Sequence, residues 1–397
     1  MSNRVSNRDA LLAGASGADA RRRAVALELI DAALAAIEPR RVTILALERA
    51  RRAGARLDGC TVFAFGKAAR GMAEGALAAC EVRGGLVVSY DDRGALGPLA
   101  LRRGGHPLPL PDAAEVGREV LALAERLGPD EVALCLVSGG GSTMLELPRE
   151  GVTLDEIARV TARLGRAGAP IEELNHARSA LSRLKAGGLA RALAPARIVN
   201  VVISDVPGAG PELVASGPTF APELAATTTT LVAADNLTAR RALVEAARAR
   251  GLVLEDTPSY FRGESREAAP AWLGACRARA DHAERDGFVW GGETTVTVRG
   301  AGRGGRCQEA ALGVLARGYA EAGLFVALGT DGVDGSSAAA GALVDRAVGE
   351  RVRACGLEPR AALDESDSDA FFRAARSRVV TGRTGTNVAD LWLYLRG

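Results

Sequence analysis

The chain has very little lysine: of its 50 basic residues, only Lys67 and Lys185 are lysines, and the other 48 are arginines. This bias indicates a coding preference that replaces lysine wherever any cation is sufficient. A lysine that remains is therefore a candidate for a site that needs a compact ammonium group and not a planar guanidinium. Chance retention is the competing explanation for both residues.

Other absences narrow the function. The formal net charge is +2, with acidic and basic residues mixed along the chain, so neither a nucleic acid nor a membrane surface is an expected partner. There is no uncharged apolar run of about 18 residues and no signal-peptide core. The cysteines are widely spaced and form no CxxC pair, so we expect free thiols in the cytoplasm. A small molecule is the expected ligand.

Familiar catalytic motifs are missing as well. The sequence contains no GxSxG elbow, no GxxxxGK[ST] loop after its first strand, and no HRD or DFG set. His106, His176 and His282 lack metal-binding spacing, so we expect each at the surface or in packing. If this protein handles phosphate, it does so without those scaffolds.

Apolar runs of strand length alternate with segments of helical period, which predicts an α/β fold. Strands are expected at 60–65, 86–90, 131–137, 198–204, 287–290, 294–298 and 324–329, and the first helix at 8–38. The length of 397 residues predicts two or three domains. The segment 251–263 contains Pro258 and Gly263, and we place the boundary there, giving domains 1–255 and 256–397.

Glycines, hydroxyls, acids and one lysine follow the predicted strands directly. They are Gly66-Lys67, Ser138-Gly139-Gly140-Gly141-Ser142, Asp205, Gly291-Gly292-Glu293 and Gly329-Thr330-Asp331. Because ligands bind beyond the carboxyl ends of strands in open α/β sheets, this set predicts a site for phosphates and a divalent cation.

Each of these motifs also has a structural explanation. The glycine loop 138–142 is either an anion nest or a flexible turn. Asp205, before Pro207-Gly208, holds a metal, accepts a proton or only forms a turn. Asp331 and Asp334 lack EF-hand spacing and are a weak metal signal.

The segment 300–312 supports two opposite interpretations. Gly300, Gly302 and Gly305 match GxGxxG, a weak signal for a dinucleotide. Arg303 and Arg306 in the same turn suggest a phosphate or carboxylate clamp, or only a solvated pair.

Several motifs along the chain, taken together, resemble those of one known family. FGKAARGMAEGA (65–76), GGHPLPLPD (104–112), LVSGGGSTMLELP (136–148), ISDVPG (203–208), GGRCQEAAL (304–312), GTDGVDG (329–335) and TGTNVADL (384–391) resemble the glycerate 2-kinase family with its C-terminal MOFRL domain. The matches keep the family order from about residue 60 to 391. Together they are specific, although each alone is modest.

The resemblance implies ATP-dependent phosphorylation of the 2-hydroxyl of D-glycerate or a closely related short sugar acid. It also implies two Rossmann-like α/β domains, with parallel or mixed sheets, and an active site in the interdomain cleft. Lys67, Asp205 and Arg306 would be catalytic, with Mg²⁺ held by Asp205 and Asp331. The expected substrate or phosphate contacts are Ser138, Gly139, Gly140, Gly141, Ser142, Lys185 and Glu309. A homodimer is one assembly that this interpretation allows.

The chain departs from the family pattern at several polar positions. These are Ala180, Gly188, Cys307, Ala338 and Ala389. The departures leave a larger acid, such as a tetronate, as a possible substrate. Two other functions compete with the kinase: an NAD(P)H-dependent reductase of hydroxypyruvate-type acids, which the GxGxxG match suggests, and a non-catalytic sensor of small acids.

Overall fold

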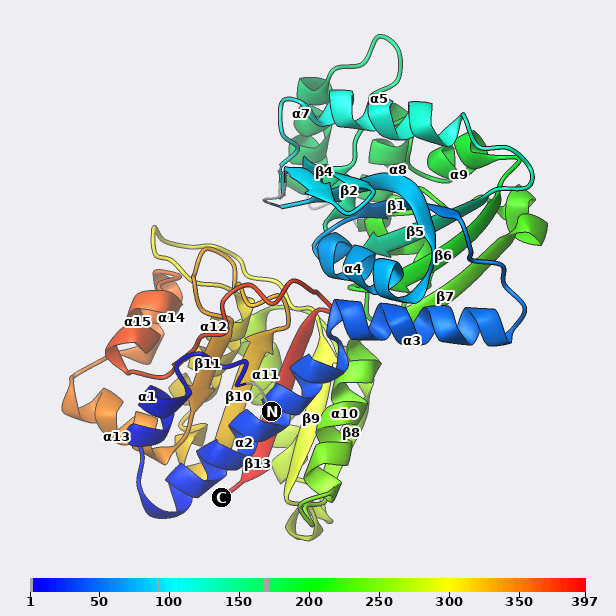
Figure 1. Ribbon diagram of the computed structural model, residues 1–397. Helices are drawn as coiled ribbons and strands as arrows, with labels where there is room; N and C mark the ends of the chain where they lie inside the picture. The colour runs from blue at the N-terminus through cyan, green and yellow to red at the C-terminus, as the bar shows by residue number, and fades with distance from the viewer. Residues whose placement is uncertain (1–2, 91–92, 107, 167–170) are drawn as a thin grey trace. The chain divides into compact units, whose positions relative to one another are not determined.

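A computed structural model describes residues 3–90, 93–106, 108–166 and 171–397. The chain folds into two compact units (Figure 1). The parallel-sheet unit contains Glu38–Asp235 and Gly385–Asn387. The mixed-sheet unit contains the residues up to Ile37, Asn236–Thr384 and Val388–Gly397. The chain therefore passes from one unit to the other several times.

The parallel-sheet unit is built on a sheet with the strand order β3-β4-β2-β1-β5-β6-β7 in its described residues. Only β3 runs antiparallel, against β4. The strands are β1 (Cys60–Phe65), β2 (Val82–Ser89), β3 (Gly94–Leu96), β4 (Leu99–Arg103), β5 (Val132–Ser138), β6 (Arg197–Ile203) and β7 (Thr228–Ala234). Strands β1 and β5 are buried along their whole length, which explains their continuous apolar runs.

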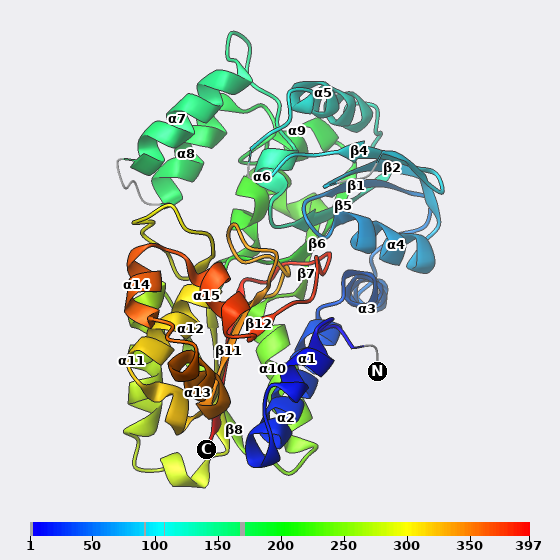
Figure 2. The same cartoon turned by 90° about the vertical axis from the view of Figure 1, so that its left-hand side faces the viewer.

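Helices cover both faces of this sheet (Figures 1 and 2). Helices α3 (Pro39–Arg52) and α4 (Ala69–Ala79) pack on one face. Helices α5 (Ala113–Ala124) and α9 (Gly188–Leu193) cover the other face, where Val116, Val120 and Leu189 join Phe63 and Phe65 in one apolar core. The remaining helices of this unit are α6 (Gly141–Met144), α7 (Leu154–Arg166) and α8 (Ile171–Leu181).

The mixed-sheet unit has the strand order β12-β11-β10-β13-β9-β8 in its described residues. Strand β13 is antiparallel to both β9 and β10, so the carboxyl ends of β9 and β10 lie at the edge where β13 begins. The strands are β8 (Leu254–Phe261), β9 (Gly287–Gly292), β10 (Gly323–Gly329), β11 (Gly341–Val344), β12 (Arg378–Val379) and β13 (Asp390–Arg396).

Helices pack on both faces of this second sheet as well. Helices α2 (Gly17–Ala36) and α10 (Asn236–Arg248) contact one face of the sheet. Helix α12 (Arg306–Ala316) contacts the other face, and α11 (Ser265–Arg277) packs against α12. The other helices are α1 (Arg8–Ala13), α13 (Arg346–Ala354), α14 (Pro359–Asp364) and α15 (Ser368–Ala374). The α/β fold class, with two helix-flanked sheets, is confirmed.

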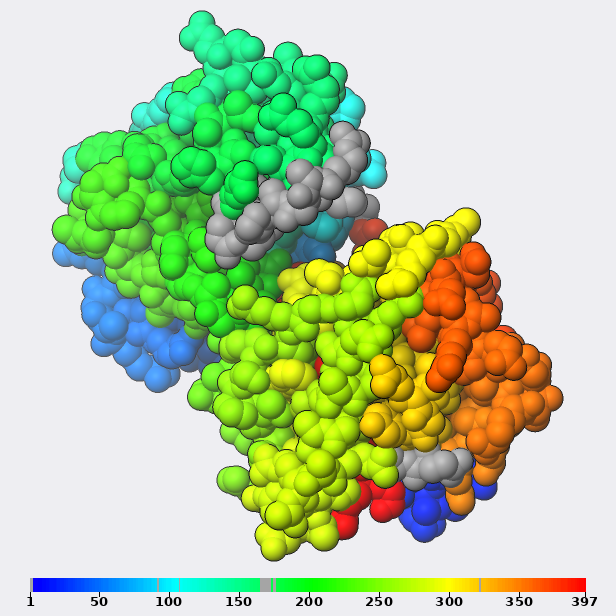
Figure 3. All heavy atoms as spheres, turned by 180° about the vertical axis from the view of Figure 1, so that it is seen from behind, coloured from blue at the N-terminus to red at the C-terminus, as the bar shows by residue number. Residues whose placement is uncertain are grey.

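The structure corrects two expectations about secondary structure. The segment 8–38 is not one helix, because the chain turns between α1 and α2 and again before Pro39. The segment 294–298 is not a strand, since Thr295 forms only an isolated bridge with Glu264. The chain there runs over the surface, yellow in Figure 3, with Val298 70% exposed, so its β-branched residues lack a sheet to pack against.

The compact units divide the chain differently from a boundary at residue 255. That position lies inside β8, which pairs with β9 in the mixed sheet. The N-terminal helix α2 contributes Arg23, whose guanidinium donates to both oxygens of Asp345 at 2.6 and 2.8 Å. This ion pair between distant parts of the sequence joins the N-terminus to the mixed-sheet unit.

Candidate functional site

The predicted lysine, glycine loop and aspartate meet at one edge of the parallel sheet. Strands β1, β5 and β6 are neighbours and parallel, so their carboxyl ends lie together. The chain continues from β1 to β2 and β4 on one side, and returns to β5 on the other side of β1. The carboxyl edge at β1 and β5 is therefore a topological switch point, the usual ligand position in such sheets.

Lys67 is held in place by backbone contacts between two loops. Its N–H donates to the carbonyl of Gly139 at 2.8 Å. The preceding Gly66 has φ +113°, and a Cβ there would lie 2.3 Å from the carbonyl oxygen of Ser138. Only glycine permits this close approach. The Lys67 side chain itself remains half-buried and accessible.

Ser138 has a structural part in this turn. Its hydroxyl accepts from the N–H of Ala68 at 3.1 Å and donates to the carbonyl of Phe65 at 3.3 Å, and the residue is fully buried. The hydroxyl thus joins β5 to the β1 turn. Both hydrogen bonds of the Ser138 hydroxyl are therefore made with the protein backbone, which suits a structural role better than a phosphate contact.

The side chains of Lys67 and His106 lie against Gly140. This glycine is left-handed, with φ +81°, and a Cβ on it would be 3.1 Å from Cγ of Lys67 and 3.2 Å from Cδ2 of His106. The ring of His106 contacts Tyr90, whose hydroxyl is 3.3 Å from Nδ1. We did not expect His106 in a site. Its position after Gly104 and Gly105, beyond β4, was the available signal.

Asp205 completes this edge. It follows β6 and is half-buried, and its Oδ2 accepts from Nδ2 of Asn387 at 3.2 Å. A Cβ at Gly139 would lie only 1.8 Å from the same oxygen. Asn387 belongs to the TGTNVADL motif, which by itself gives this residue no role. It reaches Asp205 because Gly385–Asn387 folds with the parallel-sheet unit.

The end of the glycine loop is fixed by a neighbouring serine. The hydroxyls of Ser142 and Ser216 are 2.7 Å apart, and a Cβ at Gly141 would meet that of Ala215 at 2.7 Å. Ser216 lies between the left-handed residues Ala215 and Gly217. The loop is therefore a fixed element of the fold and not a loose turn.

Lys185 does not lie with this group at the surface. It is 3% exposed and forms an ion pair with Glu146, which is 2% exposed. Burial lowers the pKa of Lys185, and the Glu146 carboxylate opposes that shift. The second lysine of the chain is thus part of a buried ion pair, whose acid Glu146 follows α6 by two residues.

In the mixed-sheet unit, Arg306 holds two acids at the carboxyl edge of β9. Its Nε and Nη2 donate to the two oxygens of Asp390 at 2.5 and 3.0 Å, and its Nη1 donates to Glu293 at 2.5 Å. Asp390 is 1% exposed, and burial raises its pKa to about 6 although Arg306 lowers it. The Arg306 side chain stays 32% exposed, so one face remains open to a ligand.

Asp331 and Asp334 take different positions beside this pair. An ideal Cβ at Gly329 would be 3.4 Å from an oxygen of Asp331 and from one of Asp390, so these two carboxylates flank the same backbone. Asp334 is buried and accepts from the N–H groups of Cys307 and Gln308 at 3.0 and 2.7 Å. It therefore satisfies the amino end of α12.

Glu309 does not face this edge. It is 1% exposed, and its Oε2 lies 3.7 Å from Nε of Arg266. Burial raises its pKa, and Arg266 opposes the shift. Its environment suits an internal ion pair better than a phosphate contact.

The GxGxxG glycines approach other parts of the chain. Added Cβ atoms at Gly300, Gly302 and Gly305 would meet Glu365, Asp367 and Asp334 within 2.4 Å. The amino end of α12 is already bonded to the Asp334 carboxylate. The segment also does not follow a strand directly, since β9 ends at Gly292. This geometry is not that of a dinucleotide-binding turn.

The family departures fall in different environments. Cys307 and Ala389 are 1% exposed, and Ala389 has φ +67°. A Cβ on Gly188 would be 2.0 Å from the Arg183 carbonyl oxygen. Ala180 and Ala338 are exposed, so they can change a surface without disturbing packing.

The described residues contain no group of three or more His, Cys, Asp or Glu side chains arranged to hold a metal ion. A cation here would need ligands from a bound phosphate as well. Within the same residues, no helix has the length and apolarity needed to cross a membrane.

Known proteins and protein families are similar to this chain over almost its whole length. Residues 25–249 match the family described as "Domain of unknown function (DUF4147)", and residues 287–390 match the MOFRL family. The D-glycerate 2-kinase of Thermotoga maritima is 31% identical, over 94% of this chain and 97% of its own. A "putative hydroxypyruvate reductase" of Agrobacterium vitis is 33% identical, over 96% and 95% of the two chains.

A solved structure agrees with these matches. The crystal structure of a glycerate kinase from Thermotoga maritima superimposes with a TM-score of 0.82 at 30% identity. The alignment covers 94% of this chain and 99% of the other.

Proposed function

Since this chain belongs to the glycerate kinase family, with a DUF4147 domain followed by a MOFRL domain, we propose that it transfers the γ-phosphoryl group of ATP to the 2-hydroxyl of D-glycerate or a closely related short sugar acid. The observation that carries the proposal is the similarity to a D-glycerate 2-kinase over 94% of this chain. In the transfer, the hydroxyl oxygen bonds to phosphorus, the bond to the bridging β-phosphate oxygen breaks, and ADP leaves.

In the parallel-sheet unit, Lys67 is the residue that we assign to charge neutralisation. Phosphoryl transfer depends mainly on positioning and on compensating the charge of the phosphoryl oxygens. The fixed backbone of Lys67 and its half-buried side chain at the carboxyl edge of the sheet suit that task. The backbone of Gly139–Ser142 is proposed to receive phosphate oxygens. Asp205 would orient the acceptor hydroxyl and take its proton.

Arg306 is the second cation of the proposal. Asp390 and Glu293 fix its guanidinium, while a third of its side chain stays exposed. A preorganised guanidinium binds a carboxylate or phosphate at low entropic cost. We assign it to the substrate carboxylate or the transferred group. Lys185 and Glu309 are assigned supporting roles, because both lie in buried ion pairs.

The magnesium ion of this proposal would be shared with the nucleotide, because the described residues contain no group of three or more His, Cys, Asp or Glu that could hold it alone. Mg²⁺ is commonly held by one or two carboxylates plus phosphates and water. We assign Asp205 and Asp331 as the carboxylates that would hold it, and the absence of a side chain at Gly139 is what lets the Asp205 carboxylate lie against the glycine loop. When bound, Mg²⁺ would neutralise charge on the β- and γ-phosphates.

The similarity to a putative hydroxypyruvate reductase favours a second candidate, a nicotinamide-dependent reductase. The turn at Gly300–Gly305 offers little support, because Asp334 occupies the helix end that would receive a pyrophosphate. Oxidation of NADH by hydroxypyruvate in the presence of the full chain would establish this candidate.

The test is ADP release from Mg-ATP with D-glycerate, L-glycerate and four- and five-carbon sugar acids. We expect turnover on D-glycerate or one longer acid, lost in Lys67→Ala, with the phosphate on the 2-hydroxyl by NMR. Turnover only on a longer acid would keep the kinase activity and make that acid the substrate. The departures from the family pattern at the exposed residues Ala180 and Ala338 agree with such a change. Binding of an acid without any ADP release would contradict the kinase and support a non-catalytic sensor of small acids.

A further inference from the structure

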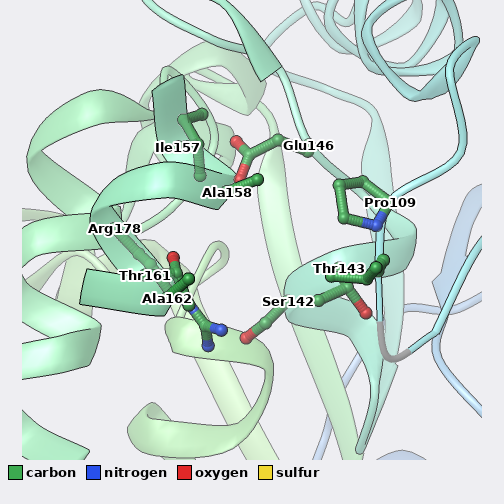
Figure 4. Close-up of a pocket in the computed structure, with 10 residues that line it drawn as sticks. Pro109, Ser142, Thr143, Glu146, Ile157, Ala158, Thr161, Ala162 and Arg178 are labelled. Carbon is green, nitrogen blue, oxygen red and sulfur yellow. The ribbon is translucent and has the colours of Figure 1, made fainter. Parts of the chain in front are cut away.

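A pocket lies beside the glycine loop within the parallel-sheet unit. Its volume is about 170 Å³ (Figure 4). It is lined by Leu108, Pro109, Ser142, Thr143, Glu146, Ile157, Ala158, Thr161, Ala162 and Arg178. Ser142 and Thr143 belong to α6, so the pocket adjoins the loop to which we assign phosphate binding. Nothing in the proposed function so far uses it.

The walls of the pocket are mainly apolar. Pro109 lies on one side, and Ile157, Ala158 and Ala162 of α7 lie on the other (Figure 4). Such a surface gives no hydrogen bonds to a molecule covered in hydroxyl groups. D-glycerate is polar over its whole surface, and placing it here would leave its hydroxyls unpaired at a cost. A flat, largely apolar ring would instead be well accommodated.

One end of the pocket carries a cation. The guanidinium of Arg178 points toward Ser142, away from Glu146 and Ile157 (Figure 4). Its Nε donates to Oγ1 of Thr161 at 3.2 Å. Among the described residues, Arg178 forms no ion pair, and Glu146 of the same pocket pairs with Lys185. Burial lowers the pKa of Arg178 and the Glu146 carboxylate opposes that shift, so a further anion beside Arg178 would add to the stabilisation of its charge.

Apolar walls joined to a cationic end match the polarity of a nucleoside phosphate. We propose that this pocket binds the adenosine part of ATP, with the base between Pro109 and α7 and the phosphates leading past Arg178 and Ser142 to the glycine loop. The inference rests on the proposed function, because it takes a nucleotide as the phosphoryl donor. It places the adenosine part of the donor, and not the acid, in this pocket.

Binding measured without turnover tests the proposal. ADP and pyrophosphate, which lacks the base and sugar, are titrated calorimetrically into the full chain with Mg²⁺. Ala158→Phe fills the pocket, and we expect it to weaken ADP by about tenfold or more while pyrophosphate binds as before. Arg178→Gln should weaken both, since it removes the charge near the phosphates. Ala78→Phe, at an exposed alanine of α4, and Arg163→Gln, at an exposed arginine of α7, are the matched controls.

The outcomes separate this inference from the function itself. Unchanged ADP affinity in Ala158→Phe would overturn it, as would a rise in the KM of the acid at unchanged KM of ATP. An absence of ADP binding in the wild type would overturn it too. Nucleotide binding that Ala158→Phe weakens, in a protein that phosphorylates no acid, would support the pocket and contradict the kinase.

Discussion

The carboxylate of Asp205 occupies the space that a side chain at Gly139 would need. An ideal Cβ at position 139 would lie 1.8 Å from Oδ2 and 2.3 Å from Cγ of Asp205. The glycine thus sets the distance between the strand-end aspartate and the loop that also holds the Lys67 backbone. If Asp205 acts in the reaction, the site requires a residue without a side chain at position 139.

We therefore expect Gly139→Ala to inactivate the protein without unfolding it. The methyl group forces Asp205 out of its position, and a displacement of about 1 Å in a catalytic group costs about 100-fold in rate. The measurement is kcat/KM for ADP release, together with the thermal midpoint of unfolding.

Gly84→Ala is the control for that substitution. Its Cβ would meet its nearest neighbour, the Pro98 carbonyl oxygen, at 3.8 Å, which is ordinary contact. Activity should remain there. Full activity in Gly139→Ala would remove Asp205 from the site, since its carboxylate cannot keep the present position.

Lys67→Arg should lose activity nearly as fully as Lys67→Ala. The lysine stem lies over Gly140 and beside His106, and a planar, longer guanidinium cannot place its charge at the same point. We expect kcat to fall by about 100-fold or more with the fold intact. Steady-state kinetics of both variants check this.

Arg70→Gln, at an exposed arginine one turn along α4, is the matched control for loss of a cation. It should leave kcat within about twofold of the wild type. Substantial activity in Lys67→Arg would mean that any cation suffices at position 67, and chance retention would then explain the lysine.

The edge of the parallel sheet was predictable from sequence because each part follows a strand directly. Gly66-Lys67, the glycine loop and Asp205 come after β1, β5 and β6, and parallel neighbours bring their carboxyl ends together. The chemistry of such a site can be read in short stretches of sequence. No pairing between distant residues has to be known.

Contacts between residues far apart in the sequence could not be predicted in this way. Asn387 reaches Asp205 across 182 residues, and no local pattern encodes that pair. Lys185 and Glu309 carry charges typical of sites, yet their partners Glu146 and Arg266 bury them. The Arg23–Asp345 pair, which links α2 to the mixed-sheet unit across 322 residues, is likewise encoded by no local pattern.

Arg23→Met should destabilise the protein strongly. Arg23 is 1% exposed, binds Asp345 through two hydrogen bonds and donates to the Leu11 carbonyl at 2.6 Å. Its removal leaves Asp345 as an uncompensated buried charge, and we expect a loss of about 3–5 kcal/mol in the free energy of unfolding. Arg21→Met, on the exposed side of α2, should change it by under about 0.5 kcal/mol. Equal effects in urea denaturation would show that the pair does not hold the N-terminus in place.

The stability of the protein should depend on pH through the buried carboxyl group of Asp334. Burial raises the pKa of this carboxyl from 3.8 to about 7, although the hydrogen bonds from Cys307 and Gln308 lower it. The folded protein therefore keeps a proton on Asp334 that the unfolded chain releases at lower pH. Its contribution to stability is complete below about pH 4 and is lost as the pH rises through about 7.

Asp334→Asn removes this titration and keeps an oxygen that can accept from the amino end of α12. The free energy of unfolding of the wild type, minus that of the variant, should therefore fall from about pH 4 to about pH 7, by at most about 1.4 kcal/mol per pH unit. Urea denaturation at several pH values measures both curves. Asp130→Asn, at an exposed aspartate, is the matched control for loss of one carboxylate, and its curve should run parallel to that of the wild type. A wild-type curve parallel to that of Asp334→Asn would mean that Asp334 is ionised in the fold throughout this range, so that the helix N–H groups outweigh burial.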